Sequence, residues 1–85
     1  MIFEEWLDFK GKIIREEEKF MNLQLYQDEI RFTICETTVI GFDIQGSVWV
    51  YYAGGTCVSK IKIAINRTPE QMFMIIKGLQ TKEEK

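Results

Sequence analysis

The alternation of hydrophobic and polar positions predicts a β-hairpin between Thr38 and Tyr52. Before the turn, isoleucine and phenylalanine recur at the period of two that is typical of a strand. Gly46 lies where a tight turn requires a positive φ angle, and β-branched and aromatic residues follow it. A two-residue turn would give the hairpin two apolar faces, since directly paired residues share a face. One face would carry Ile40, Phe42, Trp49 and Tyr51, and the other Val39, Val48, Val50 and Tyr52.

Helical periodicity predicts an amphipathic helix near each end of the chain. Between Ile2 and about Lys19, apolar residues recur at steps of three and four. Farther along, Thr68 is a candidate N-cap, Pro69 suits the first helical position, and Gln71 completes the spacing of a capping box. These three residues predict the start of the second helix. Residues 81–85 form a charged tail that we expect to fray.

Two further strands are predicted before the central hairpin. Met21–Gln27 and Ile30–Glu36 form a hairpin in a register that pairs Leu25 with Phe32, so that the apolar residues share one face. After this hairpin, the segment Glu36–Thr38 is consistent either with a turn or with one long bent strand. The chain therefore has four or five strands.

The last predicted strand, Cys57–Asn66, alternates isoleucine and lysine. We favour an odd-numbered loop or a glycine bulge at Gly54–Gly55, because either would place Ile61 on the same face as Trp49. In this register Trp49 points toward the helices and Val50 toward a partner.

The order of these elements predicts an α+β fold, with helices packed on an antiparallel meander. We expect residues 1–85 to form a single domain, because 85 residues leave room for no more. The content of 46% hydrophobic and 13% aromatic residues is typical of a folded chain.

Charge and targeting signals indicate which partners and which cellular location to expect. The formal net charge of −2 does not favour nucleic-acid binding, for which a basic excess is the usual footprint. The N-terminus carries acids where a secretion signal needs basic residues, and no apolar run approaches the roughly 20 residues that span a bilayer. Cys35 and Cys57 are then expected to be free thiols. We expect a cytoplasmic protein that does not bind membranes.

Catalytic chemistry is not indicated. The chain has no histidine, the commonest general base and metal ligand, and it has no CxxC pair or phosphate-binding glycine loop. We interpret the acidic clusters as solvated helix faces, Asp43 as a solvent-facing strand residue, and the thiols as structural. The groups weighed here are Glu4, Glu5, Asp8, Glu16, Glu17, Glu18, Asp43, Cys35 and Cys57. We therefore expect no enzyme activity, no cofactor and no metal.

The preferred functional hypothesis rests on the second apolar face of the predicted hairpin. Exposed apolar patches mark interaction sites, and symmetric dimers are the commonest soluble assemblies. We expect a protein–protein interaction module that forms a homodimer through the sheet or its edge and binds another protein. Inhibitors and adaptors carried by phages and mobile elements have this size and charge, which is an analogy and not a motif. The predicted interface consists of Val39, Val48, Val50 and Tyr52.

The alternative hypothesis is binding of single-stranded nucleic acid. Basic side chains beside exposed aromatic rings form such a surface, because the cations contact phosphates and the rings stack on bases. The residues that would form it are Trp49, Tyr51, Lys60, Lys62 and Arg67. The negative overall charge disfavours this alternative.

Overall fold

The chain begins and ends with a helix, and the strands between them form one sheet. The computed structural model describes residues 1–54 and 57–81, with the backbone alone at 53, 54, 57, 58, 80 and 81. The elements are α1 (Phe3–Arg15), the 3₁₀-helix η1 (Glu17–Lys19), β1 (Met21–Leu25), β2 (Glu29–Cys35), β3 (Thr38–Asp43), β4 (Val48–Gly54), β5 (Cys57–Ala64) and α2 (Pro69–Thr81). The predicted α+β order of helix, antiparallel meander and helix is confirmed.

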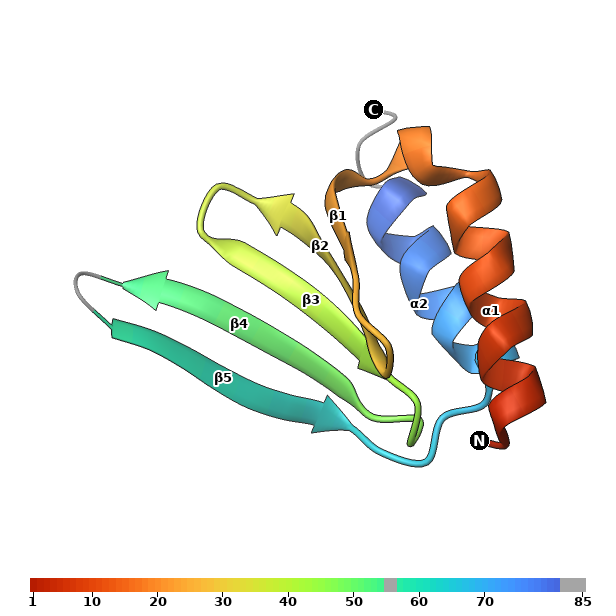
Figure 1. Cartoon of the computed structure of the whole chain (residues 1–85). Coiled ribbons are helices and arrows are strands. Elements are labelled where there is room, and N and C mark those ends of the chain that lie inside the picture. The colour runs from red at the N-terminus through yellow and green to blue at the C-terminus, as the bar shows by residue number, and fades with distance from the viewer. Residues whose placement is uncertain (55–56, 82–85) are drawn as a thin grey trace.

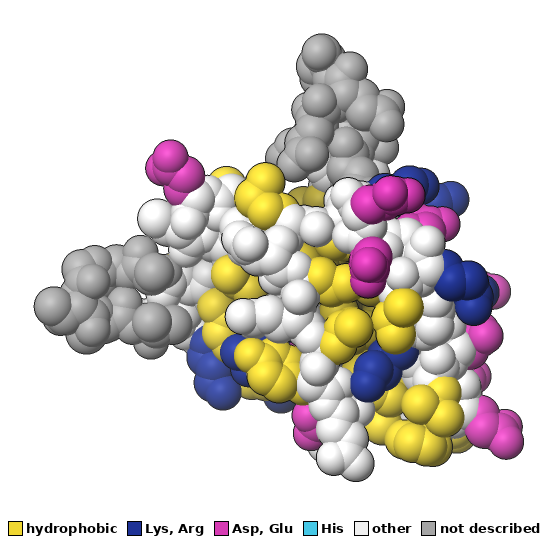
Figure 2. Space-filling model, turned by 45° about the horizontal axis from the view of Figure 1, so that its top comes forward, with side chains coloured by type: hydrophobic (Ala, Val, Ile, Leu, Met, Phe, Trp, Pro, Cys, Tyr) yellow, Lys and Arg dark blue, Asp and Glu magenta, His cyan; other side chains and the backbone are white. Residues whose placement is uncertain are grey.

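The sheet has five strands in the order β1-β2-β3-β4-β5, so each strand pairs with its neighbours in sequence. Cys35 pairs with Thr38 across a turn, which decides between the two predicted strand counts in favour of five. Both helices lie on the same face of the sheet, on the side of β1, β2 and β3 (Figure 1). In the space-filling view, hydrophobic side chains gather in the middle of the visible face, between charged groups (Figure 2).

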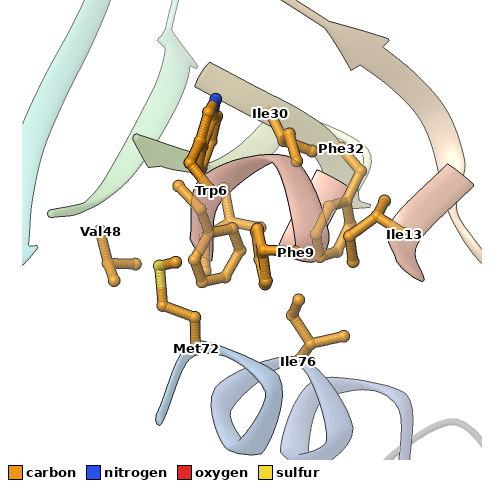
Figure 3. Close-up of a cluster of buried hydrophobic side chains, with 10 residues drawn as sticks. Trp6, Phe9, Ile13, Ile30, Phe32, Val48, Met72 and Ile76 are labelled. Atoms are coloured by element: carbon orange, nitrogen blue, oxygen red, sulfur yellow. The ribbon is translucent and has the colours of Figure 1, made fainter. Parts of the chain in front are cut away.

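The hydrophobic core lies between the helices and the sheet. Figure 3 shows Phe9 in the middle of this cluster, with Met72 and Ile76 reaching toward it from α2. The Phe9 ring lies 4.9 Å from that of Phe73, centroid to centroid. The buried members are Trp6, Phe9, Ile13, Ile30, Phe32, Ile40, Phe42, Val48, Met72 and Ile76. Each large side chain buried in this way stabilises the fold by about 1.5–3 kcal/mol.

The register of the central hairpin differs by one residue from the predicted register. The N–H of Asp43 donates to the carbonyl of Ser47 at 3.1 Å, and the N–H of Gly46 donates back to Asp43 at 3.0 Å. Gly46 has φ 86°, so the loop has three residues and ends in a left-handed glycine. Phe42 consequently faces Val48, not the predicted Trp49. A slip of one residue moves every side chain of a strand to the other face, so the predicted grouping of faces is wrong.

The first hairpin keeps its predicted faces in a different register. Leu25 pairs with Ile30, and Gln24 pairs with Arg31. This register is shifted by two residues from the predicted one, and an even shift leaves each side chain on the same face. A bulge between Met21 and Gln24 interrupts β1.

The pairing of β4 with β5 is also not the predicted one. Trp49 faces Lys62, and Gly54 faces Cys57, which corresponds to an even-numbered loop. The preference for an odd loop is therefore wrong, and residues 55 and 56 themselves lie outside the described residues. Because Ile61 faces Val50, it lies on the helix side of the sheet, opposite to Trp49.

The start of α2 agrees with the prediction from the sequence. The N–H of Thr68 donates to Oε1 of Gln71 at 2.9 Å, and the N–H of Gln71 donates to Oγ1 of Thr68 at 3.2 Å. This reciprocal pair satisfies backbone donors that a helix leaves free in its first turn. The predicted charged tail lies outside the described residues from residue 82 onward.

Candidate interaction surfaces

The sheet face opposite the helices, called the open face below, carries aromatic and charged side chains in rows. Arg31 pairs with Gly41, Gly41 with Trp49, and Trp49 with Lys62, so this row crosses four strands. Directly paired residues share a face, which places these side chains beside one another. The neighbouring row includes Tyr51, which pairs with Lys60.

Trp49 lies at the centre of one group of contacts on the open face. Its indole N–H donates to Oδ2 of Asp43 at 2.9 Å. The Nζ atoms of Lys60 and Lys62 lie 4.8 and 5.0 Å from the ring centroid, within the range of cation–π attraction. The tryptophan ring is therefore held by an acid at its edge and by two cations over the ring.

Asp43 also organises the turn between β3 and β4. Its Oδ1 accepts the backbone N–H groups of Gln45 at 3.0 Å and Ser47 at 2.9 Å. A carboxylate can accept several such bonds, and charge-assisted bonds are stronger than neutral ones. Asp43 was predicted to be a solvent-facing strand residue, and the structure adds that it connects the turn to Trp49.

A second group of contacts joins Glu29, Arg31 and Tyr51. The hydroxyl of Tyr51 donates to Oε2 of Glu29, and Nη2 of Arg31 lies 2.9 Å from Oε1 of the same carboxylate. The Arg31 guanidinium also lies 4.4 Å from the ring centroid of Tyr51 and 4.8 Å from that of Tyr26. Both carboxylate oxygens of Glu29 are thus engaged.

Two members of this network have raised pKa values. Burial, and then the hydrogen bond to Glu29, raise the pKa of Tyr51 to about 12. The hydrogen bond to Glu29 also raises the pKa of Arg31 above its usual value, against the opposing effect of burial. Tyr51 is therefore a neutral hydrogen-bond donor and Arg31 a cation throughout the neutral pH range.

Gly41 provides the space in which this network fits. A Cβ atom at position 41 would lie 2.6 Å from Oε2 of Glu29 and 3.0 Å from Cε1 of Tyr51. Any larger residue would have to displace one of these two side chains. The glycine is thus part of the packing of the open face.

The structure brings together most of the residues of the alternative hypothesis. Trp49, Tyr51, Lys60 and Lys62 share the open face. Arg67 lies instead beside the β3–β4 turn, where its N–H donates to the carbonyl of Gly46 at 2.8 Å. The polar groups of the two aromatic side chains are bonded to Asp43 and Glu29, and cations lie against both rings.

On the helix side of the sheet, an apolar strip remains exposed at the end formed by β4 and β5. Two packed helices, each about 10 Å wide, cover roughly 20 Å. The sheet has five strands, and strands spaced at about 4.8 Å give it a width of roughly 24 Å. Figure 1 accordingly shows β4 and β5 extending beyond the helices. The apolar strip consists of Tyr52 and Ile61, which lie on the helix side and are 42% and 51% exposed. Ile63 and Ile65, which are 52% and 55% exposed, come after the bulge that follows Lys62 and flank Ala64, which pairs with Val48.

The four residues of the predicted partner interface do not form one surface. Val48 and Val50 are 0% and 9% exposed and face the helices, so the prediction that Val50 contacts a partner is wrong. Val39 pairs with Tyr51 on the open face, whereas Tyr52 pairs with Thr38 on the helix side. The prediction that Trp49 points inward is wrong for the same reason, the shifted register of the hairpin.

Two features of these surfaces were not predicted from the sequence. Glu29, Arg31 and Tyr26 join the open-face network without having been singled out. Ile61 was predicted to lie with the core. A comparison of sheet width with helix width, which needs only the number of elements, would have indicated that one strand stays uncovered.

The remaining candidate groups whose side chains the structure describes are exposed. Asp8 pairs with Lys12 at 3.6 Å, and Glu16 with Lys19 at 3.4 Å, as expected of solvated helix faces. Cys35 is a free and exposed thiol, and the Cys57 side chain lies outside the described residues. Within residues 1–54 and 57–81, no group of three or more acidic or cysteine side chains is arranged to hold a metal ion.

Comparison with known proteins does not assign the chain to a family. The chain matches no protein-family model, and neither the curated proteins nor the solved structures give a significant match. Among the described residues, no helix is long and apolar enough to cross a membrane.

Proposed function

We propose that this protein is a non-catalytic protein-interaction module that binds through the apolar strip and the adjoining edge of β5. One observation carries the proposal: Ile61 is 51% exposed although it belongs to the helix side of the sheet, and it lies on β5, whose outer edge pairs with no other described strand. Contiguous exposed apolar residues at such a place are typical of interaction sites. Burying the exposed half of Ile61 on a partner would contribute about 1 kcal/mol.

The contacts on the open face support a binding role and not a catalytic one. A catalytic group needs a free reactive atom near the position of a substrate. Here the Tyr51 hydroxyl and the Glu29 carboxylate are bonded to each other, and Arg31 is paired with the same carboxylate. The exposed thiol of Cys35 supports a reducing cytoplasmic setting for the protein.

Selection from a displayed peptide library tests the proposal without a known partner. The wild-type protein should select peptides that no longer bind Ile61→Glu, because the substitution places a charge in the apolar strip. Met74→Glu is the matched control, since Met74 is 70% exposed on α2 and lies outside the strip. Selected peptides should bind Met74→Glu as well as the wild type. Peptides that bind Ile61→Glu equally well, or a selection that returns none, would contradict the proposal.

Nucleic-acid binding is the second candidate, and the position of two lysines over Trp49 favours it. Phosphates would attract Lys60 and Lys62 away from the ring, so Trp49 emission should change when an oligonucleotide is added at low salt. The buried Trp6 should not respond. Lys60→Glu should abolish this response and Ile61→Glu should preserve it, which separates the two candidate functions.

A further inference from the structure

We propose that the edge of β5 binds an extended segment of another protein as an additional strand, and that this segment alternates acidic and apolar residues. The inference rests on the proposed function and adds the chemistry of the partner. Strand addition at an open sheet edge is a recurring mode of peptide recognition, in which backbone bonds provide affinity and alternate side chains provide specificity.

The orientation of the backbone along β5 follows from the central hairpin. Asp43 donates a backbone hydrogen bond to Ser47, and bonded and non-bonded pairs alternate along antiparallel strands. The pair of Asp43 and Ser47 is hydrogen-bonded, so on β4 the backbone groups of Trp49 point toward β3 and those of Val50 toward β5. Val50 pairs with Ile61, so the backbone groups of Ile61 point toward β4. The N–H and C=O groups of Lys60 and Lys62 therefore point away from the sheet and are open to an incoming strand.

The two edges of the sheet differ in how well they could accept such a strand. On β1, a bulge lies between Met21 and Gln24, and Asn22 has φ 54°, which breaks the regular spacing of the edge. Bulges and short strands are common means of protecting edges. β5 pairs with β4 without interruption from Cys57 to Lys62, and its bulge comes only after Lys62. The receptive edge is therefore that of β5.

The lysines of β5 leave its backbone accessible. Lysine on an edge strand usually protects the edge by extending a charge beyond it. Here Lys60 and Lys62 lie over Trp49 on the neighbouring strand, with Nζ 4.8 and 5.0 Å from its ring. Side chains of a docked strand on the open face would lie beside these two lysines, so acidic residues are favoured there. Side chains on the helix side would meet Ile61, so apolar residues are favoured at the alternate positions.

A second copy of this chain fits the edge poorly. A closed dimer requires a two-fold axis, and strands related by such an axis run antiparallel. When the Lys60–Lys62 segments of two copies lie against each other in this way, lysine stands opposite lysine on the open face. Like charges in directly opposite positions destabilise a strand pair. Acidic residues of a different chain remove this repulsion.

Two synthetic peptides test the inference on the full chain. One alternates glutamate and valine over about nine residues, and the other replaces each glutamate with lysine. Binding is followed by NMR through the backbone amides of Lys60 and Lys62, which should gain protection from hydrogen exchange. The indole N–H of Trp6, which donates to the carbonyl of Gln27 at 3.1 Å, reports that the core is unchanged. The acidic peptide should bind roughly tenfold or more tightly than the lysine peptide.

Two variants provide the controls. The double substitution Lys60→Glu and Lys62→Glu should reverse the preference between the peptides, and Ile61→Glu should weaken both. Equal binding of the two peptides at these amides would overturn the inference about charge but leave the proposed function intact. Protection of β1 amides in place of β5 amides, or a dimer in light scattering that the acidic peptide cannot dissociate, would overturn the inference as well. Loss of all binding at the strip, by these and by library-selected peptides, would instead contradict the proposed function.

Discussion

The two faces of the sheet are ordered by different interactions. On the covered face, side chains such as Phe42 and Ile30 are fully buried and belong to a cluster of apolar side chains. On the open face, which α1 and α2 leave uncovered, Trp49 and Tyr51 are held by hydrogen bonds and by cations over their rings. The first kind of order scales with buried area and has no preferred direction, whereas the second depends on angles and charges.

This difference explains how a fold with one layer of helices and one sheet can leave one face of the sheet exposed. Aromatic rings on an uncovered sheet would attract other proteins if their faces were free. Here Lys60, Lys62 and Arg31 lie against those rings and keep the surface charged. Tyr52 and Ile61 of the apolar strip are, in contrast, 42% and 51% exposed. The difference between rings covered by cations and these exposed side chains directs attention to β5.

The largest difference between the faces should appear when a large side chain is removed from each. Phe42→Ala should lower the free energy of unfolding by about 3–5 kcal/mol, because it leaves a cavity in a close-packed core. Val39→Ala on the open face should cost about 1 kcal/mol, since Val39 is only partly buried. Urea denaturation of both variants measures the difference. Equal losses would mean that the open face is packed as tightly as the core.

Removal of the carboxylate at position 43 should have the next largest effect. Asp43→Ala leaves three donors without their acceptor, namely two backbone N–H groups and the Trp49 indole. We expect a loss of about 2–3 kcal/mol, since a donor to a charged group is left unsatisfied. Asp8→Ala is the matched control, because Asp8 forms only an exposed pair with Lys12, and its loss should cost about 0.5 kcal/mol or less. A similar loss in both variants in urea denaturation would show that Asp43 does not hold the turn.

A methyl group added on the open face should destabilise the protein, whereas the same group added on α2 should not. Gly41→Ala would place a Cβ atom 2.6 Å from Oε2 of Glu29, so one side chain must move, at a cost of about 1–3 kcal/mol. Gly78→Ala meets no atom within 4 Å and should stabilise the helix by roughly 0.5–1 kcal/mol. Thermal unfolding of the two variants should therefore show a lower melting temperature for Gly41→Ala and a higher one for Gly78→Ala. A stabilising Gly41→Ala would mean that the open-face network is loosely packed.

The elements of the fold could be predicted because their signals are local. The cap of α2 depends on residues three positions apart, and Thr68 and Gln71 form the expected pair. The register of the central hairpin is not a local property. The turn is shaped by the bonds of Asp43 to two backbone groups, and Gly46 packs against the backbone of Arg67, more than 20 residues away in the chain. A two-residue turn at Gln45-Gly46 fits the pattern of hydrophobic residues equally well, so the pattern alone could not decide.

The candidate surface was predictable only in part, and for a related reason. Lys60 and Lys62 share a face in any register, because side chains two positions apart in a strand point the same way. Whether that face is also the face of Trp49 depends on the loop between β4 and β5. The exposure of Ile61 depends on the width of the helical layer, which is a property of the whole fold and not of the strand.

The smallest expected effect concerns the protonation of Tyr51 on the open face. Its folded pKa is about 12, whereas an unfolded tyrosine has a pKa of about 10. Because the folded value is the higher one, the stabilisation is fully present below pH ~10 and is lost as the pH rises toward about 12. The cause is burial together with the bond to Glu29, since a phenolate beside that carboxylate would be repelled.

Urea midpoints measured at several pH values between about 8 and 11 test this loss. The stability of the wild type should fall more steeply above pH ~10 than that of Tyr51→Phe, which has no proton to lose. The two proteins differ at position 51 alone, so the difference between the two curves isolates this position. Tyr52→Phe, on the helix side of the same strand, should follow the wild-type curve. Parallel curves for the wild type and Tyr51→Phe would show that the Tyr51–Glu29 hydrogen bond does not persist in solution.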